Sequence, residues 1–519
     1  KLRVRGIAPE RIAKLTVRFP LRRESARFVL RQLVQDVRPL TGFGWEGPAG
    51  PVWLGGHDRG LAFAYDTPLF LSAHRRSQVQ VVEEADRTWL CLNLVDAPGQ
   101  VTDEGQVFRF FLTPTPTKPV SLRKDGLFHT ALWFENWSDY QGYPDLAKLP
   151  EVRRRSDEAH ARGVPQVLYF SQVLAENSPG FAECRSEFLV PPGMAWYRRA
   201  YDPGRDVPCW VSCPRGPFGD RLLDGMERLA AQGGIDGVYM DGLSVPWDCT
   251  NPAHAACAQP VTPMWDRDEL TPLVATRAFL KRVRGIFDQR GHPRLFAHTG
   301  GAINIETLSL YDGYYEGEQL ARYRPGFRLP LHQAAVGYCG RPWGFRTDAI
   351  PVAYGTRRLM ALAALHDTEV GGDSTELERC MYTDFQSDAA VDYRPYWRTQ
   401  PHVRPVAGNV IYSYYRKPGA ALLVVSNLTW DTQQAELDVS GLFAGRPIHA
   451  IDLDRRVPVA VAGSRLGLSL KPHRFAAIRL EPGAGEEAAP PFRRPNRPAV
   501  HIAEYRDAGR RQPGRPARS

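Results

Sequence analysis

The sequence contains no apolar run of about eighteen residues, the length that a membrane-spanning helix requires, so no membrane span is expected. Its first thirty residues have no apolar segment behind a basic one, and no signal peptide is expected there either. Because the chain begins at Lys1 rather than Met, the compartment stays open, with a periplasmic or secreted protein favoured over a cytoplasmic one.

Several catalytic motifs are also missing. The sequence has no His-Glu-x-x-His, no Gly-x-Ser-x-Gly and no glycine loop of the kind that cradles phosphate. Its eight cysteines include no Cys-x-x-Cys pair and so predict no metal framework. Cys249 and Cys257 bracket a loop that a disulfide could close, and buried thiols are an equal alternative. We therefore expect no metal and no cofactor.

The formal net charge of +9 is not concentrated in a binding module. The segment from Glu481 to Ser519 holds eight Arg and five acidic residues, a charge of +3, which leaves +6 for the rest of the chain. Elsewhere basic and acidic residues are interspersed, and no pattern of aromatic and basic residues typical of nucleic-acid binding is present. We expect no nucleic-acid partner, and composition leaves the oligomeric state open.

The two ends of the chain differ in pattern from its middle. Residues 1–118 alternate apolar and polar positions, as in Trp89–Val95, which predicts an antiparallel β-sandwich. The Pro- and Thr-rich stretch Thr113–Pro119 predicts a linker. Residues 403–480 return to the strand pattern and predict a second, smaller sandwich. Residues 481–519 have few large apolar side chains to bury and are expected to be disordered.

Residues 119–402 alternate short apolar runs with helical segments, which is typical of an α/β fold. The length of this region suits a (β/α)₈ TIM barrel flanked by the two sandwiches. The strands are expected at 129–134, 164–170, 207–212, 234–241, 294–298, 311–316, 334–338 and 366–370, with helices near 145–162, 218–232, 268–289 and 356–365.

Two of these strands deliver carboxylates to the end of a barrel where active sites lie. Asp241 ends an apolar run and precedes Gly242, which leaves room for a substrate, although an Asp there could instead cap the next helix. Glu316 and Glu318 follow a later strand, and their spacing would point both to one side. Glycoside cleavage needs two carboxyl groups. We expect Asp241 as nucleophile and Glu316, slightly ahead of Glu318, as acid/base.

Other polar and aromatic residues at the expected strand ends suit sugar binding. Carboxylates can bind hydroxyl groups, and flat aromatic faces can stack on a sugar ring, although bulky residues also fill a barrel core. His298 has no partner at a spacing typical of metal ligands, so a contact to a substrate hydroxyl is expected instead. The expected substrate-binding residues are Glu135, Trp137, Asp139, His298, Trp247, Trp343, Arg322 and Asp367.

Four stretches resemble glycoside hydrolase family 123-like proteins: Pro51–Phe63, Phe108–Pro119, Gly237–Gly242 and Tyr314–Glu318. The resemblance extends over roughly residues 40 to 480. It implies a sandwich followed by a barrel and a retaining glycosidase. The founding members of the family are described as β-N-acetylgalactosaminidases, in which an adjacent Asp-Glu pair works with the acetamido group of the substrate as nucleophile.

The chain departs from that family where its catalytic pair would stand, because Asp241 is followed by Gly242 and not by Glu. Chemistry assisted by an acetamido group is therefore not expected. The layout instead resembles retaining α-glycosidases of the α-galactosidase type. We expect a glycoside hydrolase that cleaves an oligo- or polysaccharide by double displacement. A non-catalytic carbohydrate-binding protein on a degenerate barrel and an inverting glycosidase are the alternatives.

Overall fold

A computed structural model describes the chain from Leu2 to Gly483, with gaps. The described residues are 2–4, 11–12, 14–31, 36–40, 45–47, 51–65, 79–95, 99–100, 106–108, 110–120, 125–189, 195–202, 205–245, 249, 251, 254, 273–291, 293–322, 329–350, 354–371, 375–382, 384–385 and 391–483. The predicted disorder of the tail therefore concerns residues that lie outside the described part, apart from the first three.

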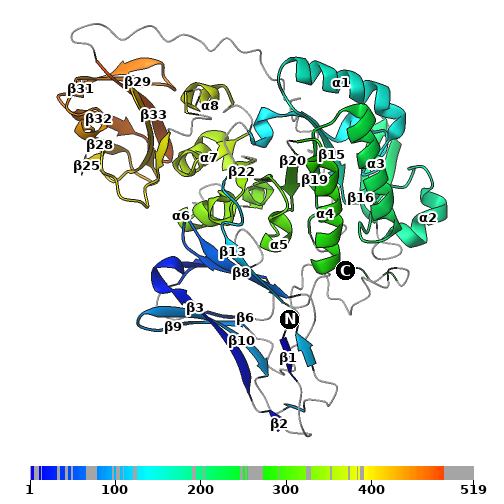
Figure 1. Ribbon diagram of the computed structural model, residues 1–519. Coiled ribbons are helices and arrows are strands. Elements are labelled where there is room, and N and C mark those ends of the chain that lie inside the picture. The colour runs from blue at the N-terminus through cyan, green and yellow to red at the C-terminus, as the bar shows by residue number, and fades with distance from the viewer. Residues whose placement is uncertain are drawn as a thin grey trace, which may run out of the picture.

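The N-terminal part of the chain forms two antiparallel sheets packed face to face (Figure 1). Apolar residues from both sheets, among them Leu54, Phe63, Leu90 and Leu92, form one buried core. Each such side chain contributes about 1.5–3 kcal/mol when it is fully buried. The sheets have the orders β3 (Leu15–Arg22), β10 (Arg87–Val95), β9 (Val79–Glu83), β6 (Trp45–Gly47) and β13 (Phe110–Thr115), β8 (Gly60–Tyr65), β7 (Val52–Gly55), β4 (Phe28–Arg31), β5 (Val37–Pro39). Two short ribbons join β1 (Leu2–Val4) to β12 (Gln106–Phe108) and β2 (Arg11–Ile12) to β11 (Gly99–Gln100).

The expected linker begins inside a strand. Thr113 to Thr115 belong to β13 and pair with β8, because the alternating pattern of the sandwich continues into this Pro- and Thr-rich stretch. The next residues attach the sandwich to the middle of the chain: the backbone N–H of Thr117 donates to Trp343 O over 2.8 Å, and Lys118 Nζ lies 3.5 Å from a carboxylate oxygen of Asp312.

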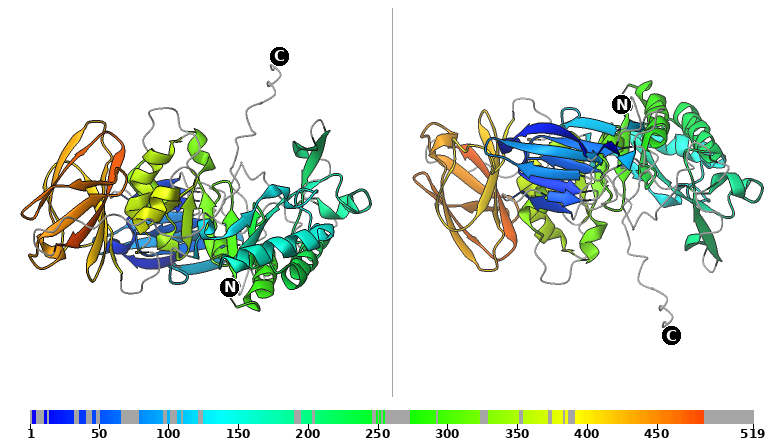
Figure 2. Two further views of the ribbon diagram at one scale, coloured as in Figure 1. Left: turned by 90° about the horizontal axis from the view of Figure 1, so that it is seen from above. Right: turned by 90° about the horizontal axis from the view of Figure 1, so that it is seen from below.

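The middle of the chain forms a curled sheet of parallel strands (Figures 1 and 2). Figure 2 shows this part between the C-terminal sandwich at one end of the molecule and helices α1 to α3 at the other. The strand order is β14 (Ala131–Trp133), β15 (Gln166–Ser171), β19 (Gly237–Asp241), β20 (Arg294–His298), β21 (Gly313–Glu316), β22 (Arg346–Ala349), β23 (Glu369–Val370).

This sheet has seven described strands, not the eight of the predicted barrel. The expected strand near residues 207–212 does form, but it lies outside the parallel sheet. It belongs to an antiparallel sheet of order β16 (Val173–Ala175), β18 (Arg205–Val211), β17 (Ala195–Asp202). Strand β15 pairs directly with β19, and no ladder between β14 and β23 is present among the described residues.

The strand predicted at Ala334–Tyr338 is also wrong, because these five buried residues form a π-helix. A short apolar run can be a buried helix as readily as a buried strand, and periodicity does not separate the two. The strand that follows β21 is β22, whose sequence Arg-Thr-Asp-Ala is buried throughout although three of its residues are polar. Its polar composition conceals it in the sequence.

Helices α1, α3 and α4 lie side by side along the parallel strands (Figure 1). Helix α3 starts at Pro217, whose fixed φ suits the first turn, and ends before Gly234 in the left-handed conformation. No described helix is both long and apolar enough to cross a membrane. The helices are α1 (Leu149–Ala161), α2 (Phe181–Phe188), α3 (Pro217–Gly233), α4 (Leu273–Asp288), α5 (Ile305–Leu308), α6 (Leu331–Gln333), α7 (Thr356–Ala363) and α8 (Thr375–Tyr382).

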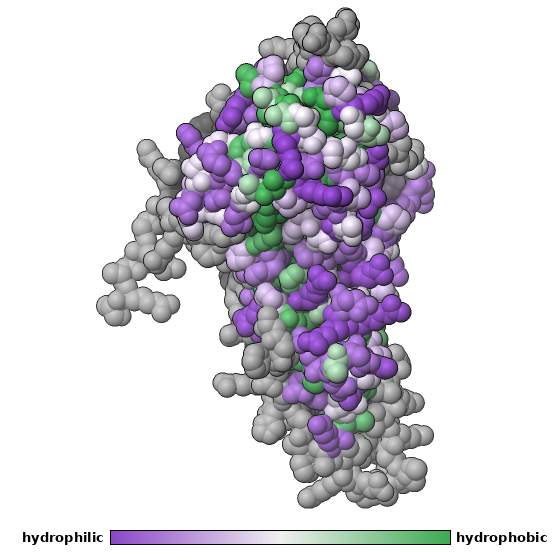
Figure 3. Space-filling model, turned by 90° about the vertical axis from the view of Figure 1, so that its left-hand side faces the viewer, coloured by the Kyte–Doolittle hydropathy of each residue, from purple (hydrophilic) through white to green (hydrophobic). Residues whose placement is uncertain are grey.

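A second pair of antiparallel sheets follows, with its own buried core that includes Leu423, Val425 and Ile478. Its first strand precedes residue 403, where the second sandwich is predicted to begin. Figure 3 shows the side of the molecule on which this C-terminal sandwich lies; the face is mainly hydrophilic, with a narrow hydrophobic band. The orders are β24 (Asp392–Arg394), β26 (Ile411–Lys417), β27 (Ala420–Asn427), β33 (Arg474–Pro482), β29 (Ile448–Asp452), β30 (Val457–Val459) and β25 (Arg404–Ala407), β28 (Gln433–Asp438), β32 (Arg465–Leu470), β31 (Val461–Ala462).

Candidate active site

Strand register places three polar residues in one row at the ends of neighbouring parallel strands. Asp241 of β19 pairs with His298 of β20. Ala297 pairs with Tyr314, so His298 lies beside Tyr315 of β21. Paired residues of adjacent strands point to the same face of a sheet. Asp241, His298 and Tyr315 therefore share one face.

Asp241 is held by a tyrosine from the next strand. The hydroxyl of Tyr169, in β15, donates to Asp241 Oδ2 over 2.8 Å. Burial raises the pKa of Asp241 above its ordinary value of 3.8, although His298 and the Tyr169 hydroxyl act in the opposite direction. The strand thus presents a carboxyl group that is oriented by a donor and partly withdrawn from water.

His298 uses both ring nitrogens as donors. Its Nδ1 lies 2.8 Å from the carbonyl oxygen of Tyr315, and its Nε2 lies 3.3 Å from Glu318 Oε2. A carbonyl oxygen and a carboxylate oxygen can only accept, so each nitrogen carries a hydrogen and the ring is an imidazolium. The lowered pKa of Glu318 favours this ionised form of the pair.

The surrounding carboxylates explain why the imidazolium persists. Burial alone lowers the pKa of His298, but three acidic neighbours more than offset burial and raise this pKa well above its ordinary value of 6.5. These neighbours are Glu316, Asp241 and Glu318. We call these four residues the His298 cluster.

The spacing predicts that Glu316 and Glu318 share one strand, but only Glu316 does. Both carboxylates approach His298: Glu316 Oε2 lies 3.9 Å from its Nδ1 and Glu318 Oε2 lies 3.3 Å from its Nε2. Strand β21 ends at Glu316, and Glu318 begins the short helix η7 (Glu318–Arg322). Gly317 between them has φ 147°, and a Cβ at this position would lie 2.3 Å from Ile350 O. A glycine is therefore required at this turn. The turn returns Glu318 to the face of His298.

The two glutamates consequently have different environments. Glu316 has no exposed surface, and its Oε2 accepts hydrogen bonds from Gly301 N and the Tyr314 hydroxyl, both over 2.9 Å. The side chain of Glu318 is 54% exposed, and its hydrogen bond with His298 holds its pKa below the ordinary 4.5 although burial opposes this. Glu318 can therefore meet a substrate, whereas Glu316 is enclosed by protein donors.

Aromatic rings line the face that carries Asp241. Tyr239 stacks on Tyr169 with ring centroids 5.7 Å apart and meets Tyr315 edge-on at 6.0 Å. Phe134 packs against Tyr169 at 4.6 Å. The sequence suggested Trp137 and Trp343 for sugar stacking, but they are only 2% and 0% exposed, and Trp137 donates its indole N–H to Tyr169 O. Neither tryptophan presents a face to a substrate, because both fill the core.

Of four other residues predicted to bind substrate, the structure describes the side chain of one, Asp139. Asp139 lies in the loop after β14, is exposed, and forms an ion pair of 2.8 Å with Lys148. Trp247 lies outside the described residues, as do the side chains of Glu135 and Arg322.

Asp367 lies in a different cluster and not beside Asp241. Its carboxylate accepts a hydrogen bond from the hydroxyl of Tyr415, in β26, and lies 3.9 Å from Arg346 Nη1. Arg346 also approaches Asp348 and Glu369, each at 3.7 Å. The structure therefore places Asp367 in a different cluster from Asp241, and its role in substrate binding stays a prediction.

We call Arg346, Asp348, Asp367 and Glu369 the Arg346 cluster. This cluster joins the two edges of the curled sheet. Asp348 Oδ2 accepts from the backbone N–H of Leu127 over 2.8 Å, and Glu369 Oε1 lies 3.2 Å from His129 Nε2. Leu127 and His129 immediately precede β14, whereas Asp348 belongs to β22 and Glu369 to β23. Side chains therefore connect the first strand to the last two.

Two residues that the sequence did not indicate stand beside Asp241. One is Tyr169, which appeared only as part of an apolar strand. The other is Gln172, whose amide group would lie 2.2 Å from a Cβ at Gly242, so Gly242 leaves room for this side chain. Within the described part of the chain, Gln172 Oε1 is buried and accepts no hydrogen bond.

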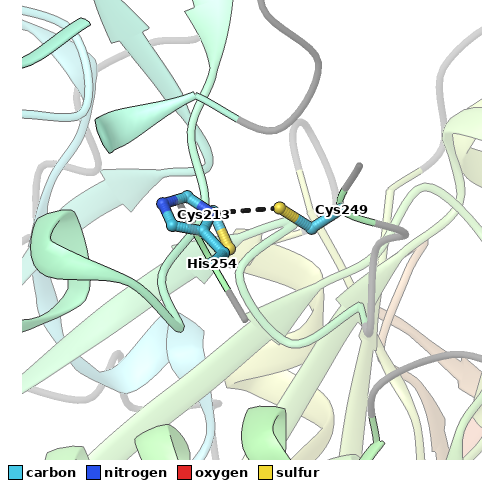
Figure 4. A group of neighbouring side chains, drawn as sticks. All are labelled: Cys213, Cys249 and His254. Carbon is cyan, nitrogen blue, oxygen red and sulfur yellow. Dashed lines mark hydrogen bonds between the residues drawn. The ribbon is translucent and has the colours of Figure 1, made fainter. Parts of the chain in front are cut away.

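Two cysteines and a histidine form a group that no sequence motif predicts. Cys213, which follows β18, lies beside Cys249 and His254 from the loop after β19, and all three are buried (Figure 4). The expected disulfide partner of Cys249, Cys257, lies outside the described residues. The seven described cysteines form no disulfide with one another. The spacing argument against a metal framework missed this group because two of its members come from segments far apart in the sequence.

No model of a protein family matches the chain, and no curated protein matches it. The resemblance to family 123-like proteins therefore stays a prediction.

Among solved structures, the chain is similar to a GH36 α-galactosidase from Geobacillus stearothermophilus in complex with stachyose, with 12% identity, a TM-score of 0.44, and coverage of 90% of this chain and 76% of that one. It is similar to an α-galactosidase from Thermus thermophilus, with 14% identity, a TM-score of 0.39, and coverage of 78% and 94%. It is also similar to a maltogenic α-amylase from Thermotoga neapolitana, with 12% identity, a TM-score of 0.40, and coverage of 64% and 81%. Likenesses this weak do not establish an activity.

Proposed function

We propose that the protein is a glycoside hydrolase that acts on an oligo- or polysaccharide by double displacement. The observation that carries this proposal is the pair Asp241 and Glu318, one at the end of β19 and the other just after β21, which lie on either side of His298 of β20. A pair of carboxyl groups in unlike environments is what glycoside cleavage requires.

In the first step Asp241 attacks the anomeric carbon while Glu318 protonates the departing glycosidic oxygen. The bond from carbon to the leaving oxygen breaks, and an ester between the sugar and Asp241 forms. Glu318 is paired as a carboxylate, so the proton comes from His298, whose Nε2 lies 3.3 Å from Glu318 Oε2; His298 passes it to Glu318 as the glycosidic oxygen departs and takes a proton back in the second step. In the second step Glu318 takes a proton from water, which attacks the same carbon and releases Asp241.

The neighbouring residues bind and position. The rings of Phe134 and Tyr315 belong to the aromatic face beside Asp241, where a sugar ring can stack. Gln172 has a buried acceptor that a sugar hydroxyl would satisfy. Glu316, enclosed by its donors, acts through His298 and the turn at Gly317 and is a positioning residue.

The test is hydrolysis of a panel of aryl α- and β-glycosides, including N-acetylhexosaminides and pentofuranosides. Asp241→Asn should lower kcat/KM by more than about 10³-fold, the scale expected for loss of a covalent nucleophile, without lowering Tm. Glu318→Gln should lower it by about 10²–10⁴-fold for poor leaving groups and less for good ones. Full activity in folded Asp241→Asn would overturn the proposal.

One observation favours the reverse roles, with Asp241 as acid and Glu318 as nucleophile: burial raises the pKa of Asp241, while His298 lowers that of Glu318. Azide separates the two assignments. When azide replaces the nucleophile in an alanine variant, the glycosyl azide has inverted configuration, and when it replaces the acid/base, the configuration is retained. Inverted product from Asp241→Ala supports the first assignment, and inverted product from Glu318→Ala supports the second.

The ion pair between Glu318 and His298 also favours a second function, a carbohydrate-binding protein without catalysis, because a paired carboxylate can simply hold sugar hydroxyls. Calorimetric titration with the sugars of the same panel distinguishes the two. Binding that weakens in Asp241→Asn, with no hydrolysis of any glycoside by the wild type, would establish the binding protein.

A further inference from the structure

A compact group of metal-ligand side chains lies beyond the strand that carries Asp241. The ligand atoms of Cys213, Cys249 and His254 all lie within 4.8 Å of one another, and the two cysteines are fully buried. Figure 4 shows the side chains of Cys213 and His254 together on one side and the sulfur of Cys249 facing them, with the hydrogen bond between His254 and Cys249 drawn as a dashed line. The apolar residues around them, including Val173 and Val211, exclude water from the group.

The hydrogen bonds of His254 fix which nitrogen faces the sulfurs. Its Nε2 lies 2.6 Å from the carbonyl oxygen of Glu187, so Nε2 carries the hydrogen and donates it. The lone pair is then on Nδ1, which lies 3.0 Å from Cys249 Sγ. A metal-binding histidine ordinarily donates its other ring N–H to a carbonyl or carboxylate in this way.

Gly216 makes this ring position possible. A Cβ at Gly216 would lie 2.6 Å from His254 Nε2, so any larger residue would push the ring away from Glu187 O. The loop is also held by Asn251, whose amide donates to Ser186 O over 2.6 Å and to Leu189 O over 2.8 Å. The histidine is therefore oriented before any ligand binds.

We propose that Cys213, Cys249 and His254 bind a zinc ion that fixes the loop after β19 to the end of β18. Two thiolates and one imidazole are ligands that zinc prefers, and tetrahedral zinc with such ligands needs S–S and S–N separations of about 3.6–3.8 Å. The observed group is close to this size, and small side-chain shifts suffice. These three side chains fill three of the four tetrahedral positions, and a water molecule would fill the fourth. We assign the ion a structural role because all three ligands are buried, which keeps a sugar away from the metal.

The consequence for the candidate active site is indirect. The loop that carries Cys249 and His254 begins immediately after Asp241, at Gly242. A metal that joins this loop to Cys213 would hold the chain that borders the Asp241 carboxyl group, whether or not the protein hydrolyses glycosides. Metal content therefore tests this proposal independently of the proposed function.

The experiment uses the full chain, purified without a histidine tag. We expect about one zinc ion per chain by inductively coupled plasma mass spectrometry, and a lower Tm after treatment with a strong chelator. Replacement of zinc by Co²⁺ should produce thiolate-to-cobalt charge-transfer absorption in the near ultraviolet. Chain that holds no zinc as purified, takes up none on reconstitution and gives no such absorption with Co²⁺ would overturn the proposal.

Variants identify the ligands. Cys213→Ser, Cys249→Ser and His254→Ala should each reduce the bound zinc to a small fraction of the wild-type content. Cys91→Ser, which removes another buried thiol, in the N-terminal sandwich, is the matched control and should keep its metal. If a variant does not fold, the cobalt spectrum of the wild type still shows whether thiolates bind the metal. Zinc retained at wild-type affinity in Cys249→Ser would contradict the assignment.

Discussion

Two clusters in this molecule have the same arrangement, in which one cationic side chain lies among three carboxyl groups. His298 lies among Asp241, Glu316 and Glu318, whereas Arg346 lies among Asp348, Asp367 and Glu369.

The clusters differ in the cation and in access to solvent. Arg346 is 2% exposed, and a guanidinium group does not lose its proton in proteins, so the cation of this cluster is fixed. His298 can lose its proton, and its partner Glu318 has half of its side chain in solvent. A cluster with a fixed cation suits the closure of a sheet, and a cluster with a titratable cation beside an open carboxyl group suits proton transfer.

The largest loss of stability is expected when the Arg346 cluster loses its cation. Arg346→Met should lower the free energy of unfolding by about 3–5 kcal/mol, because it leaves Asp348 and Glu369 buried without their cation. Denaturant titration followed by circular dichroism measures this loss. Arg346→Lys, which keeps the charge, should lose less, and wild-type stability in Arg346→Met would show that the cluster does not close the sheet.

Replacement of His298 should instead change how the thermal stability of the protein depends on pH. The folded pKa of His298 is raised, so the stability that its protonation contributes is complete below the unfolded value of about 6.5 and is lost as pH rises through the folded pKa. The Tm of wild type should therefore exceed that of His298→Gln at pH 6 and converge toward it in the alkaline range. A constant difference from pH 6 to pH 10 would show that His298 is not protonated.

Asp348 provides the complementary pH test in the Arg346 cluster. Burial, together with Glu369, raises its pKa from 3.8 to about 6. The wild type therefore loses stability as pH rises from about 4 to about 6, and Asp348→Asn does not. The Tm of the variant relative to wild type should increase over that interval and stay level above it. A relative Tm that falls over the same interval would mean that Asp348 is stabilised as the anion.

The smallest effect is expected outside both clusters. Asp139 forms an exposed ion pair with Lys148, and such pairs contribute less than about 1 kcal/mol. Asp139→Asn should keep the wild-type Tm within about 2 °C and leave the KM of the preferred glycoside unchanged. A large increase in KM would restore the substrate-binding role that the sequence suggests for Asp139.

The sequence was sufficient where a pattern is local. The parallel strands that end at Asp241 and His298 are apolar runs followed by polar residues and glycine, and both are present with the expected end points. Helix α3 follows from its Pro217 start, its apolar spacing and the glycine after it. These features depend on neighbours in the chain, so they are visible without a structure.

The sequence failed where burial is decided by distant partners. Strand β22 is polar because Arg346 and Asp348 form a buried ion pair of 3.7 Å and Asp348 accepts a hydrogen bond from Leu127, before β14, and no local pattern reveals that. Trp343 looks like a loop aromatic but is enclosed at the junction with the N-terminal sandwich. The different exposure of Glu316 and Glu318 depends on the turn at Gly317, whose conformation strand periodicity does not predict.

The most direct test of the account is covalent trapping. The wild type is incubated with fluorinated glycosyl fluorides of the sugar that the glycoside panel identifies, which slow the release of a glycosyl-enzyme, and the labelled peptide is mapped by mass spectrometry. The account predicts one sugar per chain, attached to Asp241. A label on Glu318, on a residue of the Arg346 cluster, or nowhere in an enzyme that hydrolyses the parent glycoside would contradict it.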